Sequence, residues 1–445
     1  MTVQPWVHPD HPAHANDPVV GPQPVPLPPA PARYPLRVSP DRRRLIDADG
    51  EPFLIQGDAA WSLIANLTVD EAISYLDDRQ AKGFNTIIVS VVEHLFSRQA
   101  PRDRAGNEPF TVPGDMSTPN DAYFDHAERV LQACADRGIA VILAACYIGY
   151  RHRAPGASDH AEGWYYEVVA TGPDGCQRYG EYLGRRFGRF ANIIWCIGGD
   201  WDPGDARPGL DAIAAGIRSA GVTNLFTAHV RPETSALDVF AGSDWLDVNF
   251  TYSYGIVHRA LLADWQRQPV SPFLLVESTY EGEHNASGLQ VRRQAWWSVL
   301  CGANGQCMGN NPIWLFWDGW QEALDLPASV AMARWGAFFR RLPWADLVPD
   351  IDHRLVTSGL GEARGLDRVT AALTTDGRVG VAYLPVQRAV TVDLGMCAGP
   401  HVAITWFEPA TGQRRSGGSL LAGAHVTLVP PFAEDSALLL ESVAD

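Results

Sequence analysis

The sequence predicts a (β/α)8 TIM barrel, an α/β fold, followed by a C-terminal antiparallel β-sandwich domain. Between residues 53 and 317, apolar runs of strand length alternate with amphipathic segments of helix length. Two of these runs end in a single acid. From about Pro349 the pattern changes to short alternating strands separated by Gly-rich turns. We therefore expect a Pro-rich tail over residues 1–32, a catalytic barrel over 33–348 and a small β-sandwich over 349–445.

Composition and charge narrow the class of protein. Hydrophobic residues make up 46% of the 445 and charged residues 19%, which is typical of globular proteins. The formal net charge of −16 argues against nucleic acid or an anionic membrane surface as a partner. No apolar run approaches the roughly 20 residues that a membrane span needs. We expect a protein that binds neither.

The cysteines and the N-terminus bear on the compartment. Seven cysteines are scattered without a CxxC pair, and an odd number favours a reducing environment. The first residues show no basic stretch followed by an apolar one, so no signal peptide is expected. Together these features predict a cytoplasmic protein.

The first fifty residues precede the barrel. The stretch Pro22–Pro31 is rich in proline and cannot build a core, so we expect a tail or a strap lying over the barrel. Arg37–Gly50 is typical of a short hairpin with an Asp-Gly turn.

The barrel elements follow in order. Thr68 and Glu71 match a capping box, which predicts a helix from there to about Lys82, ended by Gly83. Further helices are expected over 120–137 and 175–190, with a long loop over 149–171 between them. The eight expected strands are 53–61, 85–92, 140–147, 192–198, 224–229, 246–252, 272–277 and 306–317, of which the last is the least regular. The expected strands of the second domain are 369–373, 379–384, 389–394, 402–406 and 437–440.

The two acids follow the fourth and seventh expected barrel strands. Asp200 comes directly after the run Asn192–Gly199, and Glu277 ends the run Pro272–Val276. Either acid alone could be a helix cap or a loop ion pair. Strand C-termini converge on one face of a barrel, however, and a carboxylate buried without a partner costs several kcal/mol, so a pair there favours catalysis. Two such acids can flank a glycosidic bond. Asp202 is a rival for Asp200, but Asp202-Pro203 is more typical of a turn.

Other polar and aromatic residues lie at the same predicted strand ends. Each has an alternative structural role, as a loop ion pair, a backbone contact or a core side chain. A tyrosine near the nucleophile could hold its charge by hydrogen bonding. The candidate substrate-binding residues are Asp58, Trp61, Glu93, His94, Tyr147, His229, Tyr252, Tyr254 and Trp317.

Several motifs resemble one family. Gly57–Trp61, Tyr75–Asn85 and Gly198–Asp200 are similar to the apiosidase-like glycoside hydrolases, and the last hundred residues resemble the domain named collagen-binding that follows such barrels. The resemblance implies a retaining, exo-acting enzyme with Asp200 as acid/base and Glu277 as nucleophile. The missing signal peptide points to a small imported glycoside as substrate, of an apiose-like furanose or a related sugar, and we expect no cofactor and no metal. Asn310–Trp314 departs from the family pattern, so the sugar is less defined than the reaction.

Alternatives stay open at this point. The enzyme could act on a different sugar or invert the anomeric centre, or the barrel could bind carbohydrate without catalysis. A binding site gains little from two close carboxylates, because each raises the pKa of the other. Metal-dependent hydrolysis through His94, His229 and the acids is disfavoured because neither HxH nor HExxH occurs. We interpret the C-terminal domain as a packing partner that shields the flank of the barrel, and the oligomeric state is not predicted.

Overall fold

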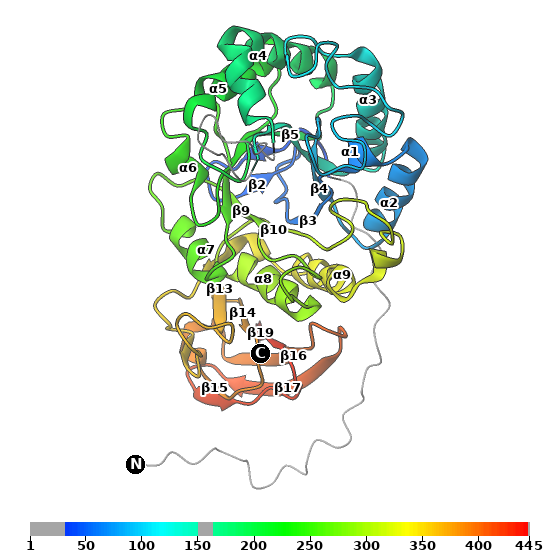
Figure 1. The fold of residues 1–445 in the computed structure, drawn as a ribbon. Coiled ribbons are helices and arrows are strands. Elements are labelled where there is room, and N and C mark those ends of the chain that lie inside the picture. Colours follow the sequence, from blue (N-terminus) through cyan, green and yellow to red (C-terminus); the bar gives the residue numbers. More distant parts are fainter. Residues whose placement is uncertain (1–31, 150–162, 444–445) are drawn as a thin grey trace.

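A computed structural model describes residues 32–149 and 163–443. An eight-stranded parallel barrel lies above a smaller β domain (Figure 1). The strand order is β7-β6-β5-β4-β3-β10-β9-β8, and a parallel bridge from Thr227 to Val248 joins its two ends. The strands are β3 Ile55–Ala59, β4 Thr86–Ser90, β5 Ala140–Tyr147, β6 Ile193–Gly198, β7 Phe226–His229, β8 Asn249–Tyr252, β9 Phe273–Glu277 and β10 Gly305–Met308. The predicted fold class is confirmed. Apart from Ala32, the predicted tail lies outside the described residues.

Helices surround the barrel. Helix α2 begins where predicted, because the Thr68 side chain accepts the backbone N–H of Glu71 while the Glu71 carboxylate accepts that of Thr68. It ends before Gly83, whose φ of 79° suits glycine. The helices are α1 Leu63–Asn66, α2 Val69–Ala81, α3 Asp121–Asp136, α4 Tyr165–Phe187, α5 Arg207–Ser219, α6 Ala236–Val239, α7 Val257–Trp265, α8 Gly288–Leu300 and α9 Pro327–Phe339.

One helix begins inside a segment that was expected to be a loop. Helix α4 starts at Tyr165 and kinks at Gly172, where φ is 69° and Pro173 follows. The Gly-Pro pair predicts a break, and the turns before it are helical because Trp164 and Val168 are buried in the core around α3 and β5. Tertiary packing therefore outweighs the local signal. The rest of the expected loop, residues 150–162, lies outside the described part of the chain.

The eighth strand is shorter than predicted. Strand β10 covers only Gly305–Met308, and the chain then turns repeatedly up to Trp317. This course is fixed from outside the strand, since the Asn66 amide donates to the carbonyls of Leu315 and Phe316 at 2.7 and 3.1 Å. The apolar run over 313–317 therefore forms a loop wall and not a strand.

The N-terminal hairpin has a different turn from the one predicted. Strands β1 (Arg37–Val38) and β2 (Leu45–Ile46) pair antiparallel and are joined through residues 39–44. The Asp49-Gly50 turn follows β2 instead. It forms there because one Asp47 carboxylate oxygen accepts the backbone N–H groups of Asp49 and Glu51.

The C-terminal domain is a sandwich of two antiparallel sheets. One has the order β11-β13-β14-β19-β16-β17 and the other β12-β15-β18. Leu384, Val392 and Leu440 are among the fully buried residues between them. The strands are β11 Leu347–Pro349, β12 Val356–Ser358, β13 Thr370–Thr374, β14 Val379–Leu384, β15 Val390–Asp393, β16 His401–Phe407, β17 Arg414–Leu421, β18 His425–Leu428 and β19 Ser436–Val443.

The larger sheet packs against α8 and α9 of the barrel (Figure 1). The Trp296 ring stacks on that of Tyr383, with centroids 5.4 Å apart and planes 7° from parallel. Beside it, the Arg292 guanidinium binds both carboxylate oxygens of the fully buried Asp435. The domain thus shields one flank of the barrel.

Candidate active site

The two acids lie together at the carboxyl ends of the barrel strands. Asp200 follows β6 by two residues, and Glu277 is the last residue of β9. One oxygen of each and one ring nitrogen of His229 all lie within 4.8 Å of one another. Gly198 allows this turn: its φ is 95°, and a Cβ there would lie 2.4 Å from the His229 carbonyl oxygen. The structure therefore brings together the two residues predicted to be catalytic.

His229, the last residue of β7, lies between the two carboxylates. Its Nδ1 is 2.9 Å from Asp200 Oδ1 and its Nε2 is 3.3 Å from Glu277 Oε2. Neither contact is a well-aligned hydrogen bond, because the ring N–H directions miss the oxygens. Burial disfavours the imidazolium, but the charge of Asp200 and its contacts, followed by those of Glu277, outweigh burial and raise the His229 pKa to about 10.

Two tyrosines hold the remaining carboxylate oxygens. Tyr252 donates to Asp200 Oδ2 at 3.1 Å, and Tyr254 donates to Glu277 Oε1 at 2.7 Å. Burial, and then the charges of the two acids, raise the pKa of Tyr252, while burial and Glu277 raise that of Tyr254. Both phenols therefore stay protonated and act as hydrogen-bond donors. Each acid thus has one oxygen toward an imidazole nitrogen and one toward a phenol.

The Glu277 carboxyl titrates together with its neighbours. Burial raises its pKa, and the nearby charge of Asp200 acts in the same direction. His229 and Tyr254 oppose this shift because they favour the carboxylate.

A cavity of about 490 Å³ opens over this group. Its volume lies in the range of small-molecule sites. Of the residues that the sequence predicted, Trp61, Glu93, Tyr147, Asp200, Tyr252, Tyr254 and Glu277 line it. The residues that sequence reasoning did not nominate are Ser90, Phe96, Trp201, Pro232, Tyr280, Glu283, His284 and Trp314. The cavity thus combines aromatic walls with four carboxylates, and no Lys or Arg lines it among the described residues.

Glu93 is a buried acceptor in the wall of this cavity. Ser62 Oγ donates to its Oε2 at 2.9 Å, and the His94 backbone N–H donates to its Oε1 at 3.0 Å. Burial raises the Glu93 pKa, and these hydrogen bonds oppose the shift. A carboxylate held in this way suits sugar hydroxyls, so its substrate-binding role stays a prediction.

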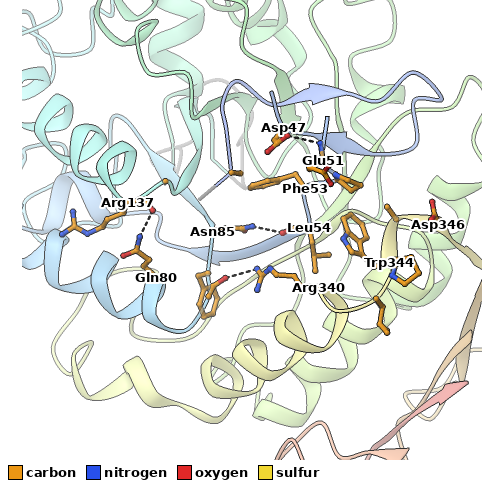
Figure 2. Close-up of a pocket in the computed structure, with 18 residues that line it drawn as sticks. Asp47, Glu51, Phe53, Leu54, Gln80, Asn85, Arg137, Arg340, Trp344 and Asp346 are labelled. Atoms are coloured by element: carbon orange, nitrogen blue, oxygen red, sulfur yellow. Dashed lines mark hydrogen bonds between the residues drawn. The ribbon is translucent and has the colours of Figure 1, made fainter. Parts of the chain in front are cut away.

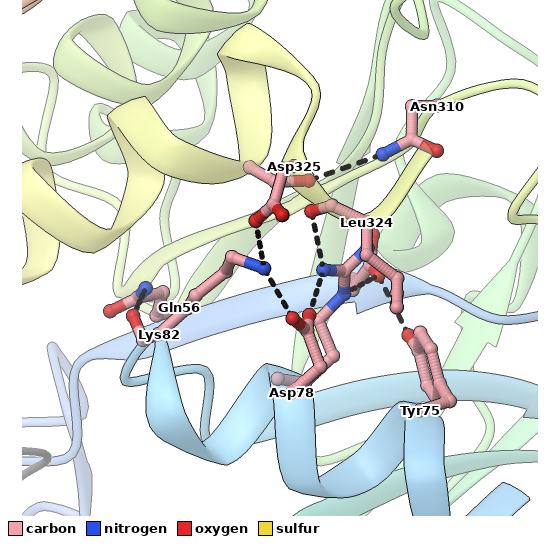
Figure 3. Close-up of polar contacts among 10 residues, drawn as sticks. Gln56, Tyr75, Asp78, Lys82, Asn310, Leu324 and Asp325 are labelled. Atoms are coloured by element: carbon pink, nitrogen blue, oxygen red, sulfur yellow. Dashed lines mark hydrogen bonds and ion pairs between the residues drawn. The ribbon is translucent and has the colours of Figure 1, made fainter. Parts of the chain in front are cut away.

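Asp58 lies away from the cavity. Its carboxylate binds the Arg79 guanidinium at 2.6 Å and the Tyr75 hydroxyl at 2.7 Å, and both charged side chains are fully buried. Asp58 therefore contacts α2. On that helix Tyr75 and Asp78 belong to the same network, and the Leu324 carbonyl, from the 3-10 helix Glu322–Asp325, accepts from Arg79 (Figure 3). The alternating pleat of the strand explains this, because neighbouring Gly57 and Ala59 face the barrel interior. The expected contact between Asp58 and sugar hydroxyls does not fit this position.

His94 and Trp317 are also outside the residues that line the cavity. His94 lies 3.4 Å from Glu167 and edge-on to Trp164. The half-exposed Trp317 donates its indole N–H to the Phe96 carbonyl. His229 faces the acids and not the cavity. Asp202, the rival acid, forms a half-exposed ion pair with Arg231 at 2.9 Å and does not line the cavity.

Four of the missed residues lie in two loops, those after β9 and β10. Tyr280, Glu283 and His284 follow Glu277 within seven residues, and Trp314 follows β10. The Trp314 indole donates to Glu283 Oε1 at 2.6 Å, which joins the two loops. The short distance in sequence from Glu277 was a usable signal for the first loop. Trp314 stands in the segment that departs from the family pattern.

A larger cavity of about 790 Å³ lies at the other end of the barrel. Leu54, Asn85 and Gly138, which line it, precede strands β3, β4 and β5, so it faces the amino ends of the strands (Figure 2). In barrels of this class, catalysis belongs to the carboxyl ends. The smaller cavity is therefore the candidate active site.

The donor set of Asp200, His229 and Glu277 has the composition of a metal site, with donor atoms within 4.8 Å of one another. Both imidazole nitrogens already face a carboxylate, however, so an ion would have to displace one of these ion pairs. The donors fit each other better than they fit a shared cation.

The barrel, its two acids at the ends of β6 and β9 and the aromatic cavity above them define the class of glycoside hydrolase barrels. A family model described as "Apiosidase-like, catalytic domain" matches residues 39–346, and one described as "Putative collagen-binding domain of a collagenase" matches 348–441. The chain belongs to the apiosidase-like family and is a glycoside hydrolase. The resemblance noted from the sequence is confirmed.

Solved structures support the same fold. A glycoside hydrolase family 5 protein from Bacteroides vulgatus is 23% identical, with a TM-score of 0.80 over 92% of this chain and 93% of that one. A structure described as a glycoside hydrolase has the same identity and TM-score over 92% and 96%. A family 5 mannosidase from Rhizomucor miehei is 12% identical, with a TM-score of 0.52 over 69% and 97%. No curated protein matches the sequence. Within the described residues, no helix has the length and apolarity to cross a membrane.

Proposed function

We propose that this glycoside hydrolase is a retaining exo-glycosidase for a small glycoside, with Asp200 as acid/base and Glu277 as nucleophile. The observation that carries the proposal is the approach of the two carboxylates, which have oxygens within 4.8 Å of each other beneath an aromatic cavity. Retaining enzymes place their carboxyl groups about 5–5.5 Å apart, whereas inverting enzymes need about 6.5–9.5 Å to admit a water.

In the first step, Glu277 attacks the anomeric carbon while Asp200 protonates the leaving oxygen. The bond from that carbon to the aglycone oxygen breaks, and its electron pair stays on the oxygen that receives the proton. The Tyr254 hydrogen bond at 2.7 Å holds one nucleophile oxygen and so fixes the carboxylate plane. The products are an ester between Glu277 and the sugar, and a free aglycone.

In the second step, Asp200 acts as a base. It takes a proton from a water molecule whose oxygen attacks the anomeric carbon, and Glu277 leaves as a carboxylate. Tyr252 donates to Asp200 Oδ2 and orients the acid for both proton transfers. The anomeric configuration is inverted twice and therefore retained.

The volume and lining of the cavity favour a small, uncharged sugar, bound next to the two acids. A volume of about 490 Å³ accommodates a sugar and part of an aglycone, which fits exo-action. Trp61, Tyr147 and Tyr280 offer apolar faces, and Glu93 offers acceptors for hydroxyl groups. The assignment of an apiose-like furanose as the sugar rests on the family description, and a related pentose is the alternative.

A panel of aryl pentosides and hexosides tests the proposal, with the product anomer followed by NMR from the first turnover. We expect the first product to keep the anomeric configuration of the substrate. If the opposite anomer formed first, the enzyme would be inverting. If no member is cleaved but a sugar binds, the barrel is a binding module.

Two variants test the roles of the acids. Asp200→Ala should keep most of its first-step rate on a dinitrophenyl glycoside but lose about 10²–10⁴-fold on an alkyl glycoside, whose poor leaving group needs the proton. Azide should rescue it as a glycosyl azide of retained configuration. Glu277→Ala should fail on both substrates, and azide should yield the opposite anomer.

Asp202→Ala is the matched control, because it removes an acid two residues away whose partner is the exposed Arg231. It should leave all rates unchanged. If Asp200→Ala showed the behaviour expected of Glu277→Ala, and Glu277→Ala that expected of Asp200→Ala, the two roles would have to be exchanged. That exchange is worth testing because burial raises the pKa of Glu277, as an acid would require.

A further inference from the structure

His229 faces an acid through each of its two ring nitrogens. The Nδ1 atom is 2.9 Å from Asp200 and the Nε2 atom is 3.3 Å from Glu277, and the side chain is 1% exposed. A neutral imidazole has one N–H and one lone pair. Its single N–H could therefore favour only one of the two carboxylates, and the unprotonated nitrogen would lie beside the other without a positive charge. The imidazolium alone attracts both.

The described residues that line the cavity above the two acids include no Lys or Arg. Among the described residues, His229 forms every ion pair that Asp200 or Glu277 makes. The other titratable groups beside His229 are the Tyr252 phenol of β8, whose ring packs edge-on against the imidazole, and the Cys196 thiol of β6, which lies next to the His229 backbone. Burial raises the pKa of both groups, so they stay neutral at ordinary pH. Trp61 and Phe250 pack around the ring without charge.

We propose that His229 is a permanent imidazolium, which serves as the shared counter-ion of both acids throughout the reaction and takes no part in proton transfer. It is a positioning residue that acts through Asp200 and Glu277. This inference rests on the proposed function, because it assigns a purpose to the cation between the two reacting carboxyl groups.

The charge of the group stays constant in this scheme. Before reaction, Glu277 is a carboxylate and Asp200 a neutral acid, so the imidazolium makes the sum zero. After the first step, Glu277 is a neutral ester and Asp200 has lost its proton to the aglycone, so the sum is again zero. A single negative charge passes from the Nε2 side of the ring to the Nδ1 side and later returns. The fixed cation touches both positions, so no charge has to be resolvated inside the barrel.

The imidazole protonation state is measurable without substrate. In protein labelled with ¹⁵N-histidine, the His229 signals, identified by their loss in His229→Gln, should show both ring nitrogens protonated from pH 6 to about pH 9. His258 is the internal control: burial first, and then the charge of Arg368, lower its pKa to about 4, so it should be neutral throughout this range. A neutral His229 ring at pH 7 would overturn the proposal.

The pH profile of kcat/KM separates a charge from a packing role. Loss of the cation in His229→Gln removes an attraction for both carboxylates, so both must gain protons more easily. Both limbs of the profile should therefore move to higher pH, by about one unit or more, and kcat should fall about 10²–10³-fold. Phe250→Leu, which alters packing against the same ring without changing charge, should leave both limbs in place.

The outcomes distinguish this inference from the proposed function. If both limbs of the kcat/KM pH profile stay in place in His229→Gln, the ring has only a packing role. This result would contradict the inference but not the proposed glycosidase function. A fully protonated ring in a protein that cleaves no glycoside would refute the function alone. If His229→Gln fails to fold, the wild-type spectrum, assigned with His258→Gln and the remaining histidine variants, still decides the protonation state.

Discussion

Asp58 illustrates how a residue in a family motif can serve the fold. The sequence placed it at the end of the first barrel strand, where a sugar contact is reasonable. The strand pleat turns it outward instead, onto Arg79 and Tyr75. A sequence shows the position of a residue along a strand, but its facing depends on the register of the pleat, and a one-residue shift reverses it.

Asp58→Ala should reduce stability and not catalysis. The change leaves the fully buried Arg79 guanidinium without its closest carboxylate, and breaking a buried pair costs about 3–5 kcal/mol. Because Asp78 still contacts Arg79 at 2.7 Å, the lower end of this range is expected. Urea unfolding measures the loss, and Asp202→Ala, which breaks an exposed pair, should cost less than about 1 kcal/mol. If Asp58→Ala lost activity while its unfolding midpoint stayed unchanged, Asp58 would have a role in substrate binding instead.

The acids themselves were predictable, and the residue between them only in part. Asp200 and Glu277 stand out because a carboxylate at the end of an apolar run is costly. His229 was nominated as a sugar ligand from its strand end, yet it contacts the acids, because β7 lies directly beside β6 in the barrel. Such a relation needs the three-dimensional register.

At the scale of elements, the loops after β9 and β10 decide the shape of the cavity. The helix α2 could be predicted from its capping box, since the signal is local. The loop over 310–317 could not, because distant groups such as the Asn66 amide fix its course. The same holds for the first half of α4, which tertiary packing makes helical.

Gly309→Ala should disturb the cavity wall through Tyr280. A Cβ at Gly309 would lie 2.4 Å from the Tyr280 ring, so this ring, which lines the cavity, must shift. We expect KM to rise about tenfold or more, with a smaller change in kcat, because the acids on β6 and β9 are not displaced.

A double-mutant cycle isolates this effect. Tyr280→Ala removes the ring that Gly309→Ala would push, so adding the alanine at 309 to Tyr280→Ala should change KM little. If the two changes instead add fully, the Gly309 substitution acts on something other than the Tyr280 ring.

At the scale of the whole molecule, the β-sandwich and the barrel share a core. Trp296 of α8 and Tyr383 of β14 stack there, and Arg292 binds Asp435 nearby. The sequence could predict two domains from the change in pattern. It could not predict this interface, because residues 143 positions apart in sequence form its ion pair.

Asp435→Ala should weaken both domains together. It removes a fully buried carboxylate that accepts from Arg292 twice and from the Tyr383 hydroxyl at 2.9 Å, which should cost about 3–5 kcal/mol. Thermal unfolding followed by tryptophan fluorescence and by loss of activity should shift to lower temperature with both probes. Glu434→Ala, at a more exposed partner of Arg292, should shift them little, and equal shifts for the two variants would contradict the role given to Asp435.

The acidic lining of the cavity also acts as a filter on what can enter. Asp200, Glu277, Glu93 and Glu283 present carboxyl groups, and no Lys or Arg lines the cavity among the described residues. A sugar ring that carries a carboxylate or a sulfate would be repelled by these carboxylates, and no described Lys or Arg in the wall would offset that repulsion. A sugar analogue whose ring nitrogen is protonated at neutral pH would instead be attracted by the carboxylates. Imino sugars of the right ring size should therefore be held more tightly than the neutral sugars they imitate, and they offer a starting point for inhibitors.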